Sequence, residues 1–148
     1  MQRDIAFVQR PGKGPGLFWL NGFRSVMRGL KASALDAFGA ANGLEVTRFD
    51  YSGHGESGGD FDDGTITRWL EETIAVFNQT HGPQIVVGSS MGGWLALLLA
   101  RHLLQTSQKR LQGLVLIAPA VDATHDLIPR RFTPEQLSAL QSQGFVER

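Results

Sequence analysis

The chain has 148 residues, of which 42% are hydrophobic and 19% charged, and its 14 basic residues balance its 14 acidic ones. These values fit one folded domain, exclude a disordered chain and argue against a basic nucleic-acid-binding surface. The sequence contains no cysteine, which excludes disulfides, thiolate zinc sites, iron–sulfur clusters and a cysteine nucleophile. We find no stretch with the pattern of a secretory signal or a membrane span, so we expect a cytoplasmic protein.

Short apolar runs alternate with segments of helical periodicity along the chain. We predict strands over residues 5–8, 17–20, 44–49, 85–87 and 114–118, with a turn over residues 10–16. We predict helices over residues 30–41, 66–77 and 91–104, and a last one that starts at Thr133-Pro134 and ends at Gly144. Strands that alternate with helices indicate a mostly parallel sheet with helices on both faces. The predicted architecture is therefore three-layer α/β.

The segment Gly88-Ser89-Ser90-Met91-Gly92 matches Gly-x-Ser-x-Gly. It follows a predicted strand and precedes a predicted helix, which is the context of a nucleophile elbow. In such a turn Ser90 projects its hydroxyl above the sheet, and Gly88 and Gly92 allow the strand and the helix to approach closely. Ser89 is the competing nucleophile, but it occupies the x position. The alternative is a serine that caps a helix beside packing glycines.

A second turn, Asn21-Gly22-Phe23-Arg24, closes the predicted strand 17–20. An oxyanion hole takes one N–H from the residue after the nucleophile, here Met91, and a second from a loop that follows another strand. Gly22 would let the backbone approach the site, and the N–H of Phe23 is the natural second donor. An ordinary Asn-Gly turn is the alternative interpretation.

The third feature is the segment Asp50-Tyr51-Ser52-Gly53-His54-Gly55-Glu56-Ser57. With the two preceding motifs, in this order, it resembles the α/β-hydrolase superfamily. The strings WLNGFRS, RFDYSGHGES and VVGSSMGGWLAL are similar to one branch of it, which contains an abhydrolase-domain palmitoyl-protein thioesterase that is also an acyl-glucuronide esterase. The resemblance extends from about residue 16 to about residue 121.

This resemblance implies a serine esterase or thioesterase without a cofactor, in which Ser90 is acylated and the N–H groups of Phe23 and Met91 form the oxyanion hole. The loop 50–57 would then be structural, and we expect His54 at the rim of the site or on the surface. The acidic residues between 60 and 63 lack the spacing of a calcium loop, and we expect them to cap the helix that follows. No metal site is predicted.

A serine hydrolase also needs a histidine base and an acid that orients it, which in this superfamily follow the serine in the order acid, then histidine. Only Asp122 before His125 keeps that order, and three residues on one loop can hardly supply both groups. His102 lies about 18 Å from Ser90 along the predicted helix. We therefore expect residues 1–148 to form a single, truncated α/β-hydrolase domain without its C-terminal strands, with residues 122–148 as the start of a cap.

The expected function is hydrolysis of a small-molecule carboxylic ester or thioester through an acyl-enzyme at Ser90. Perhydrolysis and carbon–carbon bond hydrolysis use the same elbow and stay open. The alternative is a non-catalytic fragment or interaction module. An apolar acyl site could include Phe23, Trp94 and Leu127. Because the strand 114–118 would have an unpaired apolar edge, we expect a homodimer or poor solubility.

Overall fold

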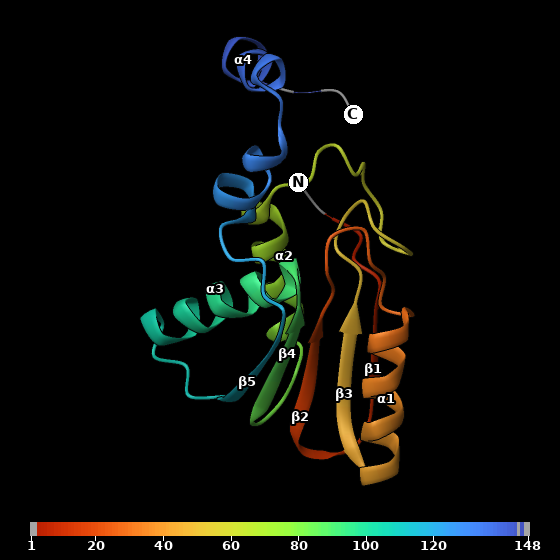
Figure 1. The fold of residues 1–148 in the computed structure, drawn as a ribbon. Coiled ribbons are helices and arrows are strands. Elements are labelled where there is room, and N and C mark those ends of the chain that lie inside the picture. The colour runs from red at the N-terminus through yellow and green to blue at the C-terminus, as the bar shows by residue number, and fades with distance from the viewer. Residues whose placement is uncertain (1–2, 145, 147–148) are drawn as a thin grey trace.

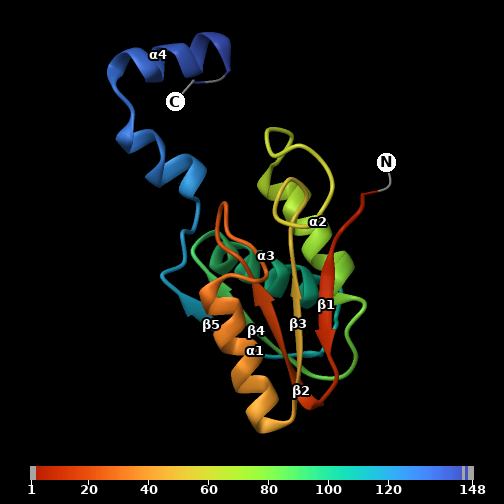
Figure 2. The same cartoon turned by 90° about the vertical axis from the view of Figure 1, so that its right-hand side faces the viewer.

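A computed structural model describes residues 3–144 and 146. Five strands form one sheet in the order β1-β3-β2-β4-β5. Figures 1 and 2 show α1 on one face of this sheet and α2 and α3 on the other. Strand β1 runs antiparallel to β3, and the remaining neighbours pair in parallel. The predicted three-layer α/β architecture with a mostly parallel sheet is confirmed.

The strands are β1 (Phe7–Arg10), β2 (Lys13–Leu20), β3 (Leu44–Phe49), β4 (Gln84–Ser89) and β5 (Leu111–Ile117). The prediction for β3 is confirmed in full, whereas β1 and β5 are displaced along the chain from the predicted ranges. The turn expected over residues 10–16 is wrong for most of its length, because Lys13 already pairs with Leu44. The pairing register shifts between Lys13 and Leu17, and such an irregularity accommodates Pro15 within a strand.

The helices α1 (Leu30–Asn42), α2 (Ile66–Phe77), α3 (Met91–Gln105) and α4 (Pro134–Gln143) are confirmed. Helix α1 ends at Gly43, whose φ of 64° is left-handed and therefore suits glycine. Helix α2 is capped by Thr65, whose hydroxyl accepts the Arg68 N–H. The expectation that the acidic residues 60–63 cap this helix is wrong. The N-cap residue is Thr65, and the nearest of these acidic residues, Asp63, lies two positions before it.

Two apolar clusters join the layers. The larger one lies between the sheet and helices α2 and α3, and includes Phe18, Phe77, Leu95 and Leu99. The smaller one packs α1 onto the opposite face. Helix α3 buries residues on most of its circumference over its first half, which is why its sequence is apolar almost throughout. Because β2, β3 and β4 are parallel, their carboxyl ends lie at the same end of the sheet.

The chain beyond β5 forms η1 (Ala123–Leu127), η2 (Pro129–Arg131) and α4. Figures 1 and 2 both show this part extending past the carboxyl ends of the strands, away from the sheet. None of its three helical segments contains a buried residue. Within the described part of the chain, no helix is both long and apolar enough to cross a membrane.

Candidate active site

Ser90 lies in the sharp turn between β4 and α3, with φ 55° and ψ −118°. An L-residue rarely adopts this conformation, and it persists only where the surroundings hold it. The Ser90 N–H donates to the carbonyl of Ile117 at 3.0 Å, and its own carbonyl accepts the N–H groups of Gly93 and Ala120 at 2.9 and 3.0 Å. Ser90 is exposed, whereas Ser89 before it is buried.

Two glycines make this turn sterically feasible. A Cβ on Gly88 would lie 2.3 Å from the carbonyl oxygen of Gly92, and a Cβ on Gly92 would lie 2.1 Å from that of Leu20. Both obstacles are backbone atoms, so no side-chain movement could relieve them. The start of α3 therefore rests directly on the ends of β4 and β2, as the spacing of the glycines predicts.

The turn after β2 lies against Ser90. A Cβ on Gly22 would lie 3.3 Å from the Ser90 Cβ, a close contact that glycine avoids. The Ser25 N–H donates to the Gly22 carbonyl at 3.0 Å, which closes a four-residue turn. Among the described residues, no acceptor binds the N–H of Phe23 or of Met91. Two unpaired backbone donors thus flank the candidate nucleophile.

A pocket of about 240 Å³ opens beside Ser90 between the β2 turn and the start of α1. Apolar side chains of Phe23, Val26 and Leu30 line it together with Lys31. Of the three residues expected to form an apolar acyl site, only Phe23 lines this pocket. Trp94 is buried and Leu127 is exposed on η1, so neither contributes to it. Val26, Leu30 and Lys31 lie beyond the motif, so the sequence did not single them out.

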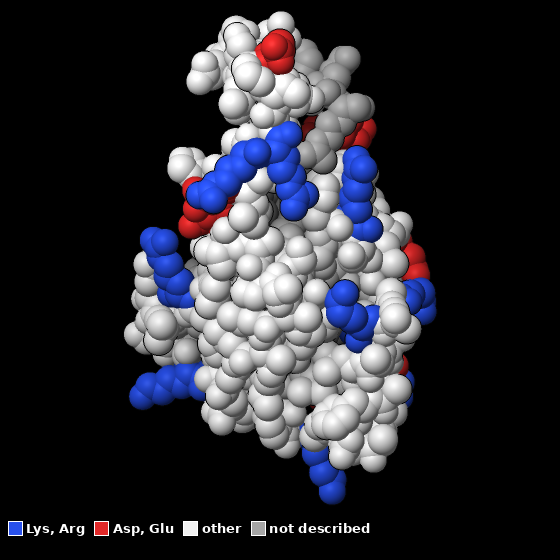
Figure 3. Space-filling model, viewed as in Figure 1, with Lys and Arg blue, Asp and Glu red and all other residues white. Residues whose placement is uncertain are grey.

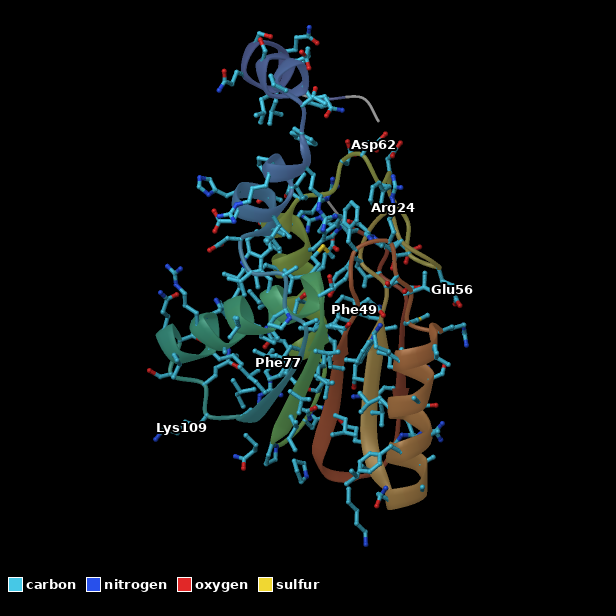
Figure 4. The ribbon with its side chains drawn as sticks, viewed as in Figure 1. Arg24, Phe49, Glu56, Asp62, Phe77 and Lys109 are labelled. Atoms are coloured by element: carbon cyan, nitrogen blue, oxygen red, sulfur yellow. The ribbon has the colours of Figure 1, made fainter. Side chains whose placement is uncertain are left out.

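The buried carboxylate of Asp50 connects the loop after β3 to the segment between the β2 turn and α1. Its Oδ1 accepts the N–H of Met27 at 2.6 Å and its Oδ2 accepts the N–H of Glu56 at 3.0 Å. A Cβ on Gly55 would lie 2.1 Å from that Oδ2, which explains a glycine at this position. Ser57 Oγ donates to the Asp50 carbonyl at 2.6 Å. Figure 4 shows Arg24 and Glu56 at this end of the molecule.

His54 occupies a different place from the one expected. Its side chain is buried, with 5% exposure, rather than lying at the rim or on the surface. The ring packs against Phe61 and Trp69 at centroid distances of 5.1 and 5.2 Å. Its Nε2 accepts the Arg24 N–H at 3.2 Å. Sequence reasoning missed this contact because loop residues carry no periodicity that tells a buried side chain from an exposed one.

The described residues bring no base to Ser90. No histidine or carboxylate among them hydrogen-bonds its hydroxyl. The His125 Nδ1 pairs with Asp126 at 2.8 Å on the exposed η1, with side chains 90% and 53% accessible. Asp122 is likewise exposed, and its backbone carbonyl accepts the His125 N–H at 2.9 Å, whereas the imidazole pairs with Asp126. The same residues contain no group of three or more side chains that could hold a metal ion.

The mostly parallel sheet with helices on both faces, together with the strained serine in the turn between β4 and α3, is the arrangement found in α/β hydrolases. A family model described as Serine aminopeptidase, S33 (Hydrolase_4) matches residues 21–144. The chain belongs to this family, and the resemblance stated from the motifs is confirmed.

Individual relatives agree with this assignment. The chain is 36% identical over 120 residues to the mitochondrial palmitoyl-protein thioesterase ABHD10 of Homo sapiens, a match that covers 80% of this chain and 38% of that protein. The bovine counterpart is 37% identical with the same coverage. The chain therefore spans about two fifths of the length of these curated relatives.

Two solved structures share the fold. The crystal structure of an Agrobacterium vitis S4 protein superposes with a TM-score of 0.90 at 45% identity, covering 99% of this chain and 58% of that one. Mouse alpha/beta hydrolase domain-containing protein 10 gives a TM-score of 0.85 at 31% identity, covering 99% and 57%. Nearly the whole chain, including most of the part beyond β5, thus has a counterpart in both.

Proposed function

We propose that this chain carries the nucleophile of an esterase or thioesterase, and that Ser90 forms the acyl-enzyme. The observation that carries the proposal is the backbone of Ser90, which is strained, exposed and held at the carboxyl end of β4 next to a pocket. Strain at such a position is typical of functional residues. The thioesterase relatives favour an acyl ester or thioester as the substrate.

The chemistry follows from the neighbouring groups. The Ser90 Oγ attacks the carbonyl carbon of the substrate and loses its proton to a base, and the carbonyl oxygen becomes an oxyanion. The unpaired N–H groups of Phe23 and Met91 donate to that oxyanion, and Met91 adds the positive end of the α3 dipole. The carbonyl re-forms as the protonated base gives that proton to the departing alcohol or thiol. Water, which gives a proton to the same base, then attacks the acyl carbon, and the proton returns to the Ser90 oxygen as the acid is released.

The alternative, a non-catalytic α/β-hydrolase module, is favoured by one observation: no base among the described residues reaches the Ser90 hydroxyl. Without a base the hydroxyl is a weak nucleophile. The two proposals therefore differ in the reactivity of one side chain, which a covalent probe measures directly.

The test is labelling with a fluorophosphonate probe, followed by mass spectrometry of the modified peptide. Hydrolase function predicts labelling that Ser90→Ala abolishes and that the neighbouring Ser89→Ala retains. An unlabelled wild-type chain with native circular dichroism would favour the non-catalytic module. Labelling that survives Ser90→Ala would show that the nucleophile is a different residue.

The cellular location stays a prediction. The curated relatives are named as mitochondrial, whereas we propose a cytoplasmic location for this chain. Fluorescence microscopy of the tagged chain in its own cells is the direct measurement.

A further inference from the structure

The turn that carries Phe23 has an unusual backbone. It closes with the bond from the Ser25 N–H to the Gly22 carbonyl, so Phe23 and Arg24 are its two central residues. Arg24 has a positive φ of 56°, whereas Phe23 does not have one. Among the common hydrogen-bonded β-turns, a positive φ at only the second central position is the pattern of type II.

Glycine normally occupies that second position, because a Cβ disfavours positive φ. With arginine there, a type I turn would be the less strained form. The two forms differ by a flip of the peptide between Phe23 and Arg24. Something must therefore hold this peptide in the orientation that the structure shows.

His54 supplies the holding contact. The Arg24 N–H can only donate, so His54 Nε2 accepts through its lone pair at 3.2 Å. The Ser52 carbonyl can only accept, so the proton sits on His54 Nδ1, 3.2 Å from that oxygen. These two partners fix a neutral ring protonated at Nδ1. The ring itself is immobilised by Tyr51, Phe61 and Trp69.

We propose that His54 is a positioning residue that holds the Gly22–Ser25 turn in its type II form and thereby restrains the turn that carries the Phe23 N–H next to the pocket at Ser90. That N–H belongs to the peptide between Gly22 and Phe23, so loss of the His54 contact would act on it by loosening the turn, not by reversing the N–H itself. In the type I form, the flipped Phe23–Arg24 peptide would point the Phe23 carbonyl, instead of the Arg24 N–H, toward His54 Nε2. The carbonyl oxygen and the Nε2 lone pair are both acceptors, so they would repel each other. The neutral Nδ1–H ring thus selects one turn form. The role in reactivity rests on the proposed hydrolase function, whereas the hold on the turn does not.

Arg24 contributes to the same arrangement from outside. Its guanidinium lies 4.9 Å from the Phe61 ring centroid and 5.8 Å from that of Phe23, and Phe61 in turn packs on His54. The arginine side chain therefore covers the turn on its exposed side. This stacking compensates in part for the strained φ of the residue that carries it.

Two substitutions of His54 distinguish the contribution of its hydrogen-bond acceptor from that of its aromatic ring. His54→Phe keeps an aromatic ring in the cluster and removes the acceptor. His54→Gln loses the ring but places an amide oxygen where Nε2 accepts. We expect His54→Phe to accelerate exchange of the Arg24 amide by at least about tenfold and to slow fluorophosphonate labelling of Ser90 about 10- to 100-fold. His54→Gln should restore both properties in large part.

A double variant tests the turn itself. Glycine adopts positive φ without strain, so Arg24→Gly in the His54→Phe background should move the labelling rate back toward the wild-type value. A merely structural role for His54 would predict no such rescue. Equal exchange and equal labelling in wild type and His54→Phe would overturn the proposal, as would increased exchange with an unchanged labelling rate.

A measurement on the wild-type chain tests which ring nitrogen of His54 carries the proton. Nitrogen-15 spectra of the histidine side chains at neutral pH should show His54 protonated at Nδ1 only. A ring protonated at Nε2 would overturn the proposal irrespective of any variant. If the wild-type chain takes up no phosphonate, the proposed hydrolase function fails, and the nitrogen spectra and the Arg24 exchange rates still decide whether His54 holds the turn.

Discussion

Two of the five non-glycine residues with positive φ in the described part of the chain lie where the chemistry is proposed, and the other three, Ser107, Ala118 and Asp122, lie elsewhere. Ser90 and Arg24 both have positive φ, and both lie at the edge of the pocket or in the turn that borders it. Each is held by hydrogen bonds from segments far away in sequence: Ser90 by the end of β5, and Arg24 by the loop after β3. The tertiary structure thus imposes conformations that the residues themselves disfavour.

Replacement of Ser90 by glycine should therefore stabilise the fold. Glycine relieves a strain of about 1–3 kcal/mol and adds a cost of about 0.5–1 kcal/mol for its freedom in the unfolded chain. We expect Ser90→Gly to exceed Ser90→Ala in free energy of unfolding by about 1 kcal/mol, measured by urea titration.

The neighbouring position provides the control for this prediction. Ser89 belongs to β4 and has no positive φ. Ser89→Gly should therefore be less stable than Ser89→Ala by about 0.5–1 kcal/mol. Glycine variants that are less stable than the alanine variants at both positions would contradict a strained Ser90.

At the scale of elements, helices α2 and α4 begin with the same kind of N-cap residue but differ in how much they bury. Thr65 caps α2 and Thr133 caps α4, in each case by accepting an N–H three residues on. Helix α2 buries five residues, including Trp69 and Phe77, whereas α4 buries none. The same local signal therefore predicts a helix in both places without indicating whether the helix belongs to the core.

This difference predicts different consequences for the same substitution. Thr65→Ala should lower the free energy of global unfolding by about 1 kcal/mol, because α2 unfolds with the core. Thr133→Ala should leave global unfolding nearly unchanged and accelerate amide exchange only within α4. Equal losses of global stability in the two variants would contradict the independence of α4.

Helix α1 is attached to the sheet through Asp36. Arg10 donates two hydrogen bonds to its carboxylate at 2.8 and 2.7 Å, and Arg48 approaches it at 3.3 Å. The bonds from Arg10, with a further contribution from the charge of Arg48, lower the pKa of Asp36 against the effect of burial. The carboxylate is thus ionised over a wider pH range in the folded chain than in the unfolded one.

The lowered pKa of Asp36 makes the stability of the fold depend on pH. Because the pKa of Asp36 is lower in the folded state, its stabilisation is present above its ordinary pKa of 3.8 and is lost as the pH falls through the folded value. Asp36→Asn should be less stable than wild type at pH 7, with the gap closing in acid. The exposed Glu56→Gln, which breaks a solvent-screened pair with Arg28, should show a smaller gap. Parallel stability curves for wild type and Asp36→Asn would contradict this account.

At the scale of the whole molecule, the two edges of the sheet differ. Strand β1 is short and contains Arg10, whereas β5 is an uncharged strand of seven residues with Val115 and Ile117 exposed at 49% and 39%. Figure 3 shows that the surface over β4 and β5 is mostly uncharged. An apolar edge with unpaired backbone groups favours pairing with another strand.

We therefore expect self-association through β5. Sedimentation velocity over a range of concentrations should show a dimer or larger species, and Val115→Lys should shift it toward the monomer. The matched control is Phe38→Lys, which changes a similarly exposed apolar side chain on α1 and should leave the association unaltered. A wild-type chain that sediments as a monomer throughout would contradict the expectation.

The apolar periodicity and the helix start and stop residues were enough to predict the layers, the helices α1 to α4 and the glycine-flanked turn at Ser90. These features depend on neighbours within a few residues. The short helical segments η1 and η2 were not predicted. Other features depend on segments that meet only after folding. These are the extension of β2 through Pro15, the burial of His54 and the hydrogen bond from the Met27 N–H to Asp50. No local pattern encodes such contacts. The composition of the pocket, with Val26, Leu30 and Lys31 beside Ser90, was likewise decided by the packing of α1 against the end of β2.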